Sequence, residues 1–284
     1  MSLSLLVDRR RLEHPLDLTL LAYLAVSGAL LLALGEGWRA LGHGGAMLGI
    51  AWLRSRDPAF WLRSWYPLPL HLWLYRETSY LGMALWGRTF DGPVLAAEEA
   101  LFGTSPALWL CERAGWLWLC ELLHACYMTF WLLLPGLGLV LQRWHGPRAL
   151  QIFFWCTYNC FLLCFACFAL VPVEGPRHLF PPLPEHLQGP LTRLCHAVTE
   201  AGAAAAAALP SSHVAVSVVA TACAARLAPR LLWLLGPLVV GIALATVYGR
   251  FHYAVDVLAG LAVAGLSWRW LGPAAFERLS GWRP

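Results

Sequence analysis

The chain has 284 residues, of which 59% are hydrophobic and only 13% are charged, and its mean hydropathy is +0.60. Soluble domains carry about a quarter charged residues, so this composition excludes an ordinary soluble domain. The net charge is +4, and every basic residue other than His is Arg, because the chain contains no Lys. Since the Arg residues are scattered along the chain, no nucleic-acid partner is expected.

The apolar residues fall into runs that can cross a bilayer, since about 20 helical residues span its hydrocarbon core. We expect membrane helices at 16–35, 65–87, 116–141, 149–171, 210–226, 231–249 and 253–271. A short Gly-rich stretch at 40–53 either crosses, re-enters or lies at the interface. The stretch 88–115 carries acidic residues among apolar ones and predicts an amphipathic interfacial helix. Six prolines predict a structured loop at 172–190, and the run from Ala203 to Ala208 favours helix.

These elements predict an all-α polytopic membrane helix bundle. Its domains are an N-terminal membrane part at 1–64, a six-helix membrane domain at 65–271 and a short tail at 272–284. The connections and ends that carry most Arg residues fall on one side if the helices alternate, which places the C-terminus in the cytoplasm. The cluster of Arg9, Arg10 and Arg11 joins that side only if 40–53 crosses, which favours eight crossings over seven.

Four cysteines recur on one face of the expected helix at 149–171, namely Cys156, Cys160, Cys164 and Cys167. A metal site is one interpretation. Packing is the favoured one, because buried Cys behaves as a small hydrophobic residue and no nearby His completes a ligand set. We therefore expect no metal and no cofactor.

Three polar stretches collect at helix ends on the side with fewer Arg residues. In the last stretch, His252 and Asp256 are four residues apart, so we expect them to share a helix face. A carboxylate beside an imidazole accepts the proton of one ring nitrogen and leaves the lone pair of the other free for nucleophilic or base chemistry. The alternative is a satisfied pair that only helps packing.

The middle stretch is Pro210-Ser211-Ser212-His213. Pro suits the first turn of a helix, and Ser211 and Ser212 suit its N-terminal cap. A helix start presents free N–H groups that bind phosphate, with His213 within reach of a leaving oxygen. In the first stretch, a Gly-Pro-Arg turn can aim Arg177 at a phosphate. Taken singly, these are a helix cap and a solvated Arg, but together they predict phosphoryl transfer.

These motifs resemble those of the type 2 phosphatidic acid phosphatase superfamily, namely Lys-x6-Arg-Pro, Pro-Ser-Gly-His and Ser-Arg-x5-His-x3-Asp. The resemblance covers roughly residues 65–271 and implies a six-helix, phosphatase-like core with membrane lipids as substrates. It implies that His252 attacks phosphorus to form a phosphohistidine, that Asp256 orients it and that His213 protonates the leaving group. It further implies that Arg177 and the backbone of Ser211 and Ser212 bind the phosphate. The distribution of Arg residues predicts that this site lies on the non-cytoplasmic face.

Several motif positions differ from the superfamily pattern. Leu170 stands at the Lys position, and Ala245 and Thr246 stand where Ser and Arg are expected. Arg250 or Arg193 can substitute for the lost charge. Because a phosphate monoester needs more positive charge than a diester, the loss favours a diester donor and head-group transfer between lipids. Pro-Ser-Ser-His and His252-Tyr-x2-Asp-x3-Gly also resemble the branch that contains inositolphosphotransferases and inositol phosphorylceramide synthases.

Glu121 and His124 lie on one face of the expected helix at 116–141. Ionisable residues inside a membrane are functional candidates, so both are possible head-group contacts. A structural pairing with each other or with Arg76 is the alternative. For the whole chain, the alternatives to a transferase are a lipid phosphate phosphatase that releases inorganic phosphate, a non-catalytic lipid-binding relative, and haem or metal binding through membrane His residues.

Overall fold

A computed structural model describes residues 15–56, 61–202 and 204–278. The chain divides into two compact units, one up to Trp73 and the other from Leu74 onward, with the boundary inside helix α5 (Pro67–Trp86). The N-terminal Arg cluster and residues 279–284 of the expected tail lie outside the described residues.

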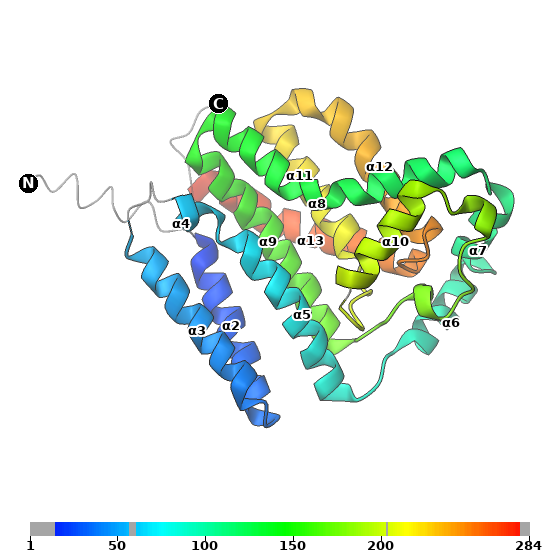
Figure 1. Cartoon of the computed structure of the whole chain (residues 1–284). Helices are drawn as coiled ribbons and strands as arrows, with labels where there is room; N and C mark the ends of the chain where they lie inside the picture. Colours follow the sequence, from blue (N-terminus) through cyan, green and yellow to red (C-terminus); the bar gives the residue numbers. More distant parts are fainter. Residues whose placement is uncertain (1–14, 57–60, 203, 279–284) are drawn as a thin grey trace, which may run out of the picture. The chain divides into compact units, whose positions relative to one another are not determined.

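The first unit contains a helical hairpin of α2 (Pro15–Ala33) and α3 (Gly37–Arg54), followed by α4 (Trp61–Trp65) (Figure 1). The turn passes through Gly35 at a φ of +82°, a conformation that glycine adopts without steric strain. Asp17 is buried in the first turn of α2. It accepts a hydrogen bond of 2.6 Å from the Tyr66 hydroxyl and lies 3.6 Å from Arg63. The Gly-rich stretch at 40–53 lies within α3 and is helical.

The second unit contains the end of α5 and eight further α-helices among the described residues. They are α6 (Asp91–Phe102), α7 (Pro106–Arg113), α8 (Leu117–His145), α9 (Pro147–Leu170), α10 (Pro190–Gly202), α11 (Ser212–Leu227), α12 (Leu232–Tyr248) and α13 (Ala254–Arg278). Short 3₁₀ turns lie at Pro176–His178, Glu185–Leu187 and Pro229–Leu231. The expected proline-rich loop is confirmed, since it contains only the first two of these turns.

Helix α9 forms the core of the second unit. It packs against α8, α11 and α13, and most of its side chains are buried. Cys156, Cys160 and Cys164 are among the buried residues, and all three are free thiols. These cysteines therefore pack as small apolar side chains in the centre of the unit.

In the part of the chain that the structure describes, five helices are long and apolar enough to cross a membrane by length and composition, namely α2, α8, α9, α12 and α13. The chain is thus an all-α polytopic helix bundle and an integral membrane protein, as expected. Two further expected spans, α5 and α11, are helical but do not meet these criteria of length and composition. Helix α11 is apolar but has only 16 residues, and α5 has 20 residues that include Arg76 and Glu77.

The expected single helix at 88–115 is wrong, because the structure has two helices there. Gly103 ends α6 at a φ of +71°, and Pro106 then opens α7 within its first turn. A left-handed glycine followed by a proline is a common stop and restart of the helical backbone.

The helix expected from the alanine run is also wrong over residues 204–208. Ala206 has a φ of +59°, and the Ala208 N–H donates a 2.8 Å hydrogen bond to the Val173 carbonyl. Ala207 forms an isolated bridge with the same residue. Pairing with the proline-rich loop therefore overrides the helix propensity of alanine. Helix α10, which follows that loop, was not expected from the sequence.

Candidate active site

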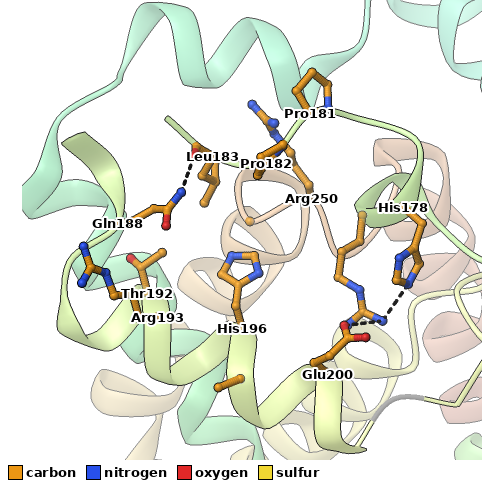
Figure 2. Close-up of a pocket in the computed structure, with 13 residues that line it drawn as sticks. His178, Pro181, Pro182, Leu183, Gln188, Thr192, Arg193, His196, Glu200 and Arg250 are labelled. Atoms are coloured by element: carbon orange, nitrogen blue, oxygen red, sulfur yellow. Dashed lines mark hydrogen bonds and ion pairs between the residues drawn. The ribbon is translucent and has the colours of Figure 1, made fainter. Parts of the chain in front are cut away.

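Arg177 lies in the 3₁₀ turn of the proline-rich loop. Its Nη2 atom is 3.7 Å from a carboxylate oxygen of Glu200 and 3.1 Å from Nε2 of His178 (Figure 2). The Glu200 side chain is 69% exposed, and an ion pair in such a position contributes little. A phosphate group can therefore replace the Glu200 carboxylate as the ion-pair partner of Arg177.

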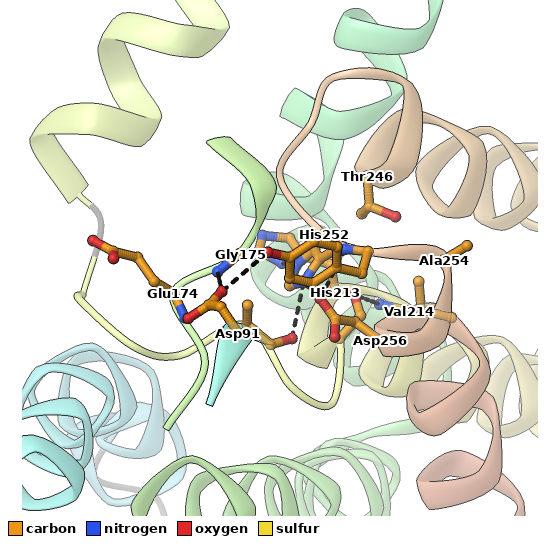
Figure 3. Close-up of polar contacts among 12 residues, drawn as sticks. Asp91, Glu174, Gly175, His213, Val214, Thr246, His252, Ala254 and Asp256 are labelled. Atoms are coloured by element: carbon orange, nitrogen blue, oxygen red, sulfur yellow. Dashed lines mark hydrogen bonds and ion pairs between the residues drawn. The ribbon is translucent and has the colours of Figure 1, made fainter. Parts of the chain in front are cut away.

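Asp91, the first residue of α6, fixes the loop that carries Arg177. Its carboxylate accepts hydrogen bonds from the N–H of Glu174 at 3.0 Å and of Gly175 at 2.8 Å, and from the Tyr253 hydroxyl at 3.2 Å (Figure 3). One buried carboxylate thus connects the Arg177 loop to the segment that contains His252.

Glu98, seven residues further along α6, holds the start of α13. It accepts hydrogen bonds from the Ser105 hydroxyl at 3.0 Å and from the Ala254 N–H. Burial raises the pKa of Glu98, and these hydrogen bonds partly oppose that shift. Asp91 and Glu98 were not predicted as members of the site from the sequence, although seven residues make about two helical turns and place both on one face.

Helix α11 begins where the sequence predicted a phosphate-binding helix start. Ser211 is the N-terminal cap, and its hydroxyl accepts a hydrogen bond of 3.5 Å from the Val214 N–H. The Ser211 N–H donates to the Asp256 carbonyl at 2.9 Å, so the starts of α11 and α13 are joined. The first N–H groups of a helix, here from Ser212 onward, have no partner within the helix and suit an anion.

Gly260 allows α13 to approach the start of α11. A Cβ atom on Gly260 would lie 2.6 Å from the Ser211 carbonyl oxygen, which is too close for any real contact. The absence of a side chain at this position therefore sets the distance between the two helices that carry the site.

We expect Gly260→Ala to lower kcat/KM at least tenfold and to destabilise the protein by about 1–3 kcal/mol, because the added methyl group forces the helices apart. Lipid turnover and thermal unfolding in detergent measure the two effects. The matched control is Gly265→Ala in the same helix, where a Cβ meets no atom within 4 Å. Equal behaviour of the two variants would contradict the proposed helix contact.

His252 lies between α12 and α13, and its imidazole is almost completely buried. Its Nδ1 atom is 2.9 Å from the Ala208 carbonyl oxygen and 3.5 Å from a carboxylate oxygen of Asp256. The expectation that His252 and Asp256 share a helix face is wrong, since α13 begins at Ala254. They meet because Asp256 turns back over the helix start, where it also accepts the Tyr253 N–H at 2.9 Å.

The two imidazoles expected at the site lie together. Nε2 of His252 is 3.4 Å from Nδ1 of His213, and the ring centroids are 5.6 Å apart. His213 is in the first turn of α11, and its ring packs on Tyr127 and Phe130 of α8. Since both neighbours of His252 Nδ1 are acceptors, the proton belongs on Nδ1 and the Nε2 lone pair faces His213.

Glu121 and His124 lie on α8, and their side chains contact α10. The Glu121 carboxylate accepts hydrogen bonds from the N–H groups of Leu191 and Thr192, at 3.0 and 2.9 Å, and so caps α10. Nδ1 of His124 is 2.7 Å from the Cys120 carbonyl oxygen. Neither residue pairs with Arg76, which donates to the Ala201 carbonyl instead.

A comparison with known protein families finds one family that matches the region containing this site. Residues 94–270 match the family model described as the PAP2 superfamily, and this is more than half of the chain. The chain belongs to the PAP2 superfamily. No curated protein and no solved structure matches it.

PAP2 membership supports lipid phosphatase or phosphotransferase activity, with membrane lipids as the substrate class. The matched residues include Arg177, His213, His252 and Asp256, whereas α2 and α3 precede the PAP2 region. The geometry at the centre of that region is therefore a pair of imidazoles, a buried carboxylate and a helix start, with one arginine in the adjoining loop.

Proposed function

We propose that this PAP2 protein transfers a phosphate-containing head group from one membrane lipid to another through a covalent intermediate on His252. The observation that supports it best is the environment of that imidazole. Its Nδ1 has two acceptors, Ala208 at 2.9 Å and Asp256 at 3.5 Å, and its Nε2 faces His213 at 3.4 Å. A nucleophile with a fixed tautomer therefore lies beside a second acid–base group.

The first step forms a bond between Nε2 of His252 and the phosphorus of a lipid phosphodiester. The bond from phosphorus to the donor alcohol oxygen breaks, and protonated His213 gives its proton to that oxygen. In the second step, neutral His213 takes the proton of an acceptor hydroxyl, whose oxygen attacks phosphorus. The P–N bond then breaks, and both imidazoles return to their starting states. Asp256 stabilises the positive ring of His252 between the steps.

The non-bridging oxygens of the phosphate would lie at the start of α11, against the backbone of Ser211 and Ser212, with Arg177 of the proline-rich loop as their cation. Arg250 is a second candidate, because it precedes His252 by two residues. Leu170 supplies no charge where the superfamily pattern has Lys. A singly charged phosphodiester suits this modest positive charge better than a monoester dianion, as in the inositolphosphotransferase branch that the motifs resemble.

We also propose the arrangement of this activity in the membrane. The distribution of Arg residues favours a cytoplasmic C-terminus and an active site on the opposite face, within a catalytic domain at about 65–271.

A lipid panel tests the proposed activity. Purified protein in mixed micelles would receive candidate phospholipid donors and lipid alcohol acceptors, with products identified by mass spectrometry. We expect a new head-group lipid and a matching donor alcohol in equal amounts, inhibited by vanadate as a phosphate mimic. Release of inorganic phosphate without a new lipid would instead identify a phosphatase. Lipid binding without any conversion would identify a non-catalytic relative.

A further inference from the structure

A second pair of imidazoles lies next to the segment that carries His252. Nε2 of His196 on α10 is 3.3 Å from Nε2 of His124 on α8. Phe251, the residue before His252, packs against both rings, with centroid distances of 5.0 Å to His196 and 5.9 Å to His124. The pair therefore adjoins the site, and the proposed mechanism uses neither of its rings.

The hydrogen positions of this pair follow from its backbone contact. The Cys120 carbonyl oxygen, 2.7 Å from Nδ1 of His124, can only accept, so that Nδ1 carries a hydrogen and Nε2 of His124 has a lone pair. Nε2 of His196 must then donate to it. A lone pair is left on Nδ1 of His196, and no hydrogen bond to that atom occurs among the described residues.

His196 remains a neutral acceptor at neutral pH. Burial lowers its pKa to about 4, with smaller contributions from His124, Arg177 and Arg250. An imidazole takes up a second proton only near or below its pKa, so the lone pair on Nδ1 of His196 is available under ordinary conditions.

His196 lines a pocket of about 470 Å³, together with Arg177 and Arg250, the two cations proposed for the reacting phosphate. A pocket of this size suits a small ligand or a lipid head group. It is therefore the place for the part of the donor that adjoins the phosphate. Figure 2 shows His196, Arg250 and Gln188 around this space.

Gln188 gives the pocket a second neutral acceptor. Its Nε2 donates a hydrogen bond of 2.6 Å to the Leu183 carbonyl, which fixes the orientation of the amide, since a carbonyl cannot accept from the amide oxygen. The amide oxygen of Gln188 has no hydrogen-bond partner among the described residues. Two acceptors from α10 and the loop before it thus line one pocket.

The charge of the pocket decides which donor these acceptors suit. A neutral acceptor can bind a hydroxyl or an ammonium group. Arg177, Arg193 and Arg250 line the pocket against a single carboxylate, that of Glu200, whose side chain is 69% exposed. This excess of positive charge repels a cationic head group, so the charge favours a neutral hydroxyl donor.

We propose that His196 and Gln188 are specificity-determining residues that accept hydrogen bonds from hydroxyl groups of the donor head group, which is therefore a polyol. The assignment rests on the proposed function, because it takes this pocket as the place of the head group beside the reacting phosphate.

The first experiment compares two lipids that differ only in hydroxyl groups. Short-chain phosphatidylglycerol and phosphatidylpropanol have the same charge and a three-carbon head group, but only the first has head-group hydroxyls. Calorimetry on the full-length His252→Ala protein in detergent measures their affinities without turnover. We expect phosphatidylglycerol to bind about tenfold tighter, because two neutral hydrogen bonds are gained.

Two variants in this background each remove one acceptor. His196→Phe keeps an aromatic ring against Phe251, and Gln188→Leu changes a residue of the loop before α10. We expect each to weaken phosphatidylglycerol binding about three- to fivefold and to leave phosphatidylpropanol binding unchanged. The matched controls are His145→Phe and Gln142→Leu, which make the same substitutions at the far end of α8 and should alter neither affinity.

Gln188→Leu still tests the assignment if His196→Phe does not fold, because the two acceptors lie on different segments. Equal affinities for the two lipids in protein with both acceptors would overturn the assignment. An affinity ratio that neither variant changes would overturn it as well.

Turnover by the active enzyme separates this assignment from the proposed function. We expect kcat/KM to show the same preference for phosphatidylglycerol over phosphatidylpropanol. Turnover of both donors with equal kcat/KM would keep the proposed function and overturn the assignment. Preferential binding of phosphatidylglycerol with no lipid turned over would overturn the proposed function and leave His196 and Gln188 as a hydroxyl-binding site.

Discussion

Replacing His252 by Ala is expected to lower kcat by about 10⁴-fold or more, because the substitution removes the only atom that can form the proposed bond to phosphorus. Losses of this size accompany removal of a nucleophile in enzymes that use covalent intermediates. Turnover of the best donor from the lipid panel gives the rate. Mass spectrometry of acid-sensitive adducts on rapidly quenched protein gives the second readout, since wild-type protein should carry a head-group phosphate on His252 and the variant should carry none.

His145→Ala is the control for this substitution, because it removes an imidazole at the far end of α8 and should leave turnover and the adduct unchanged. Undiminished turnover in the His252 variant would refute the mechanism. Lost turnover with an adduct still present on another residue would show that the nucleophile had been assigned to the wrong side chain.

Replacing Asp256 by Asn is expected to lower kcat by about 10²–10³-fold. The substitution removes the negative charge that stabilises the positive imidazole, and a buried site strengthens that interaction. The loss should be smaller than for His252, because the Ala208 carbonyl at 2.9 Å still accepts the Nδ1 proton and keeps the nucleophile in the correct tautomer. The rate constants of adduct formation and decay, measured in single turnovers, report the effect.

Glu99→Gln on α6 is the control for Asp256, because it makes a similar change of charge on an exposed side chain. A variant of Asp256 as inactive as His252→Ala, with intact folding by thermal unfolding, would mean that the carboxylate and not Ala208 sets the tautomer. Full activity would remove Asp256 from the mechanism.

Much of the fold follows from local sequence patterns. Long apolar runs predict α8, α9, α12 and α13, because membrane helices require about 20 apolar residues in sequence. The predicted bounds of α9 and α12 agree to within two residues, whereas α8 and α13 extend four and seven residues beyond their predicted ends. The secondary-structure predictions are wrong where contacts with segments distant in sequence determine the backbone conformation. Ala206 is left-handed because its neighbours pair with Val173, and no propensity scale includes that partner. Helix α10 is amphipathic and too polar for a membrane span, so a search for long apolar runs does not detect it.

The site shows the same division between local and distant information. The spacing of His213, His252 and Asp256 predicted a common site, and in the structure the three side chains lie together. Backbone partners could not be predicted. The contact between the Ala208 carbonyl and His252 cannot be predicted from residue types, because every residue has a backbone carbonyl. Asp91 and Glu98 fall in the stretch 88–115, which the sequence predicts as an amphipathic interfacial helix, because acids on such a helix resemble a solvated face until their partners are known.

Helix α6 has a consequence for how this site can vary. Asp91 holds the Arg177 loop and Glu98 holds the start of α13, so seven residues of helix, about 10 Å of rise, act as a fixed spacer between them. One inserted residue would turn one of the carboxylates by about 100° and release its end. Substitutions between the two carboxylates of α6 are therefore tolerable, whereas insertions and deletions are not. The number of residues between Asp91 and Glu98 thus fixes the distance between the Arg177 loop and the start of α13.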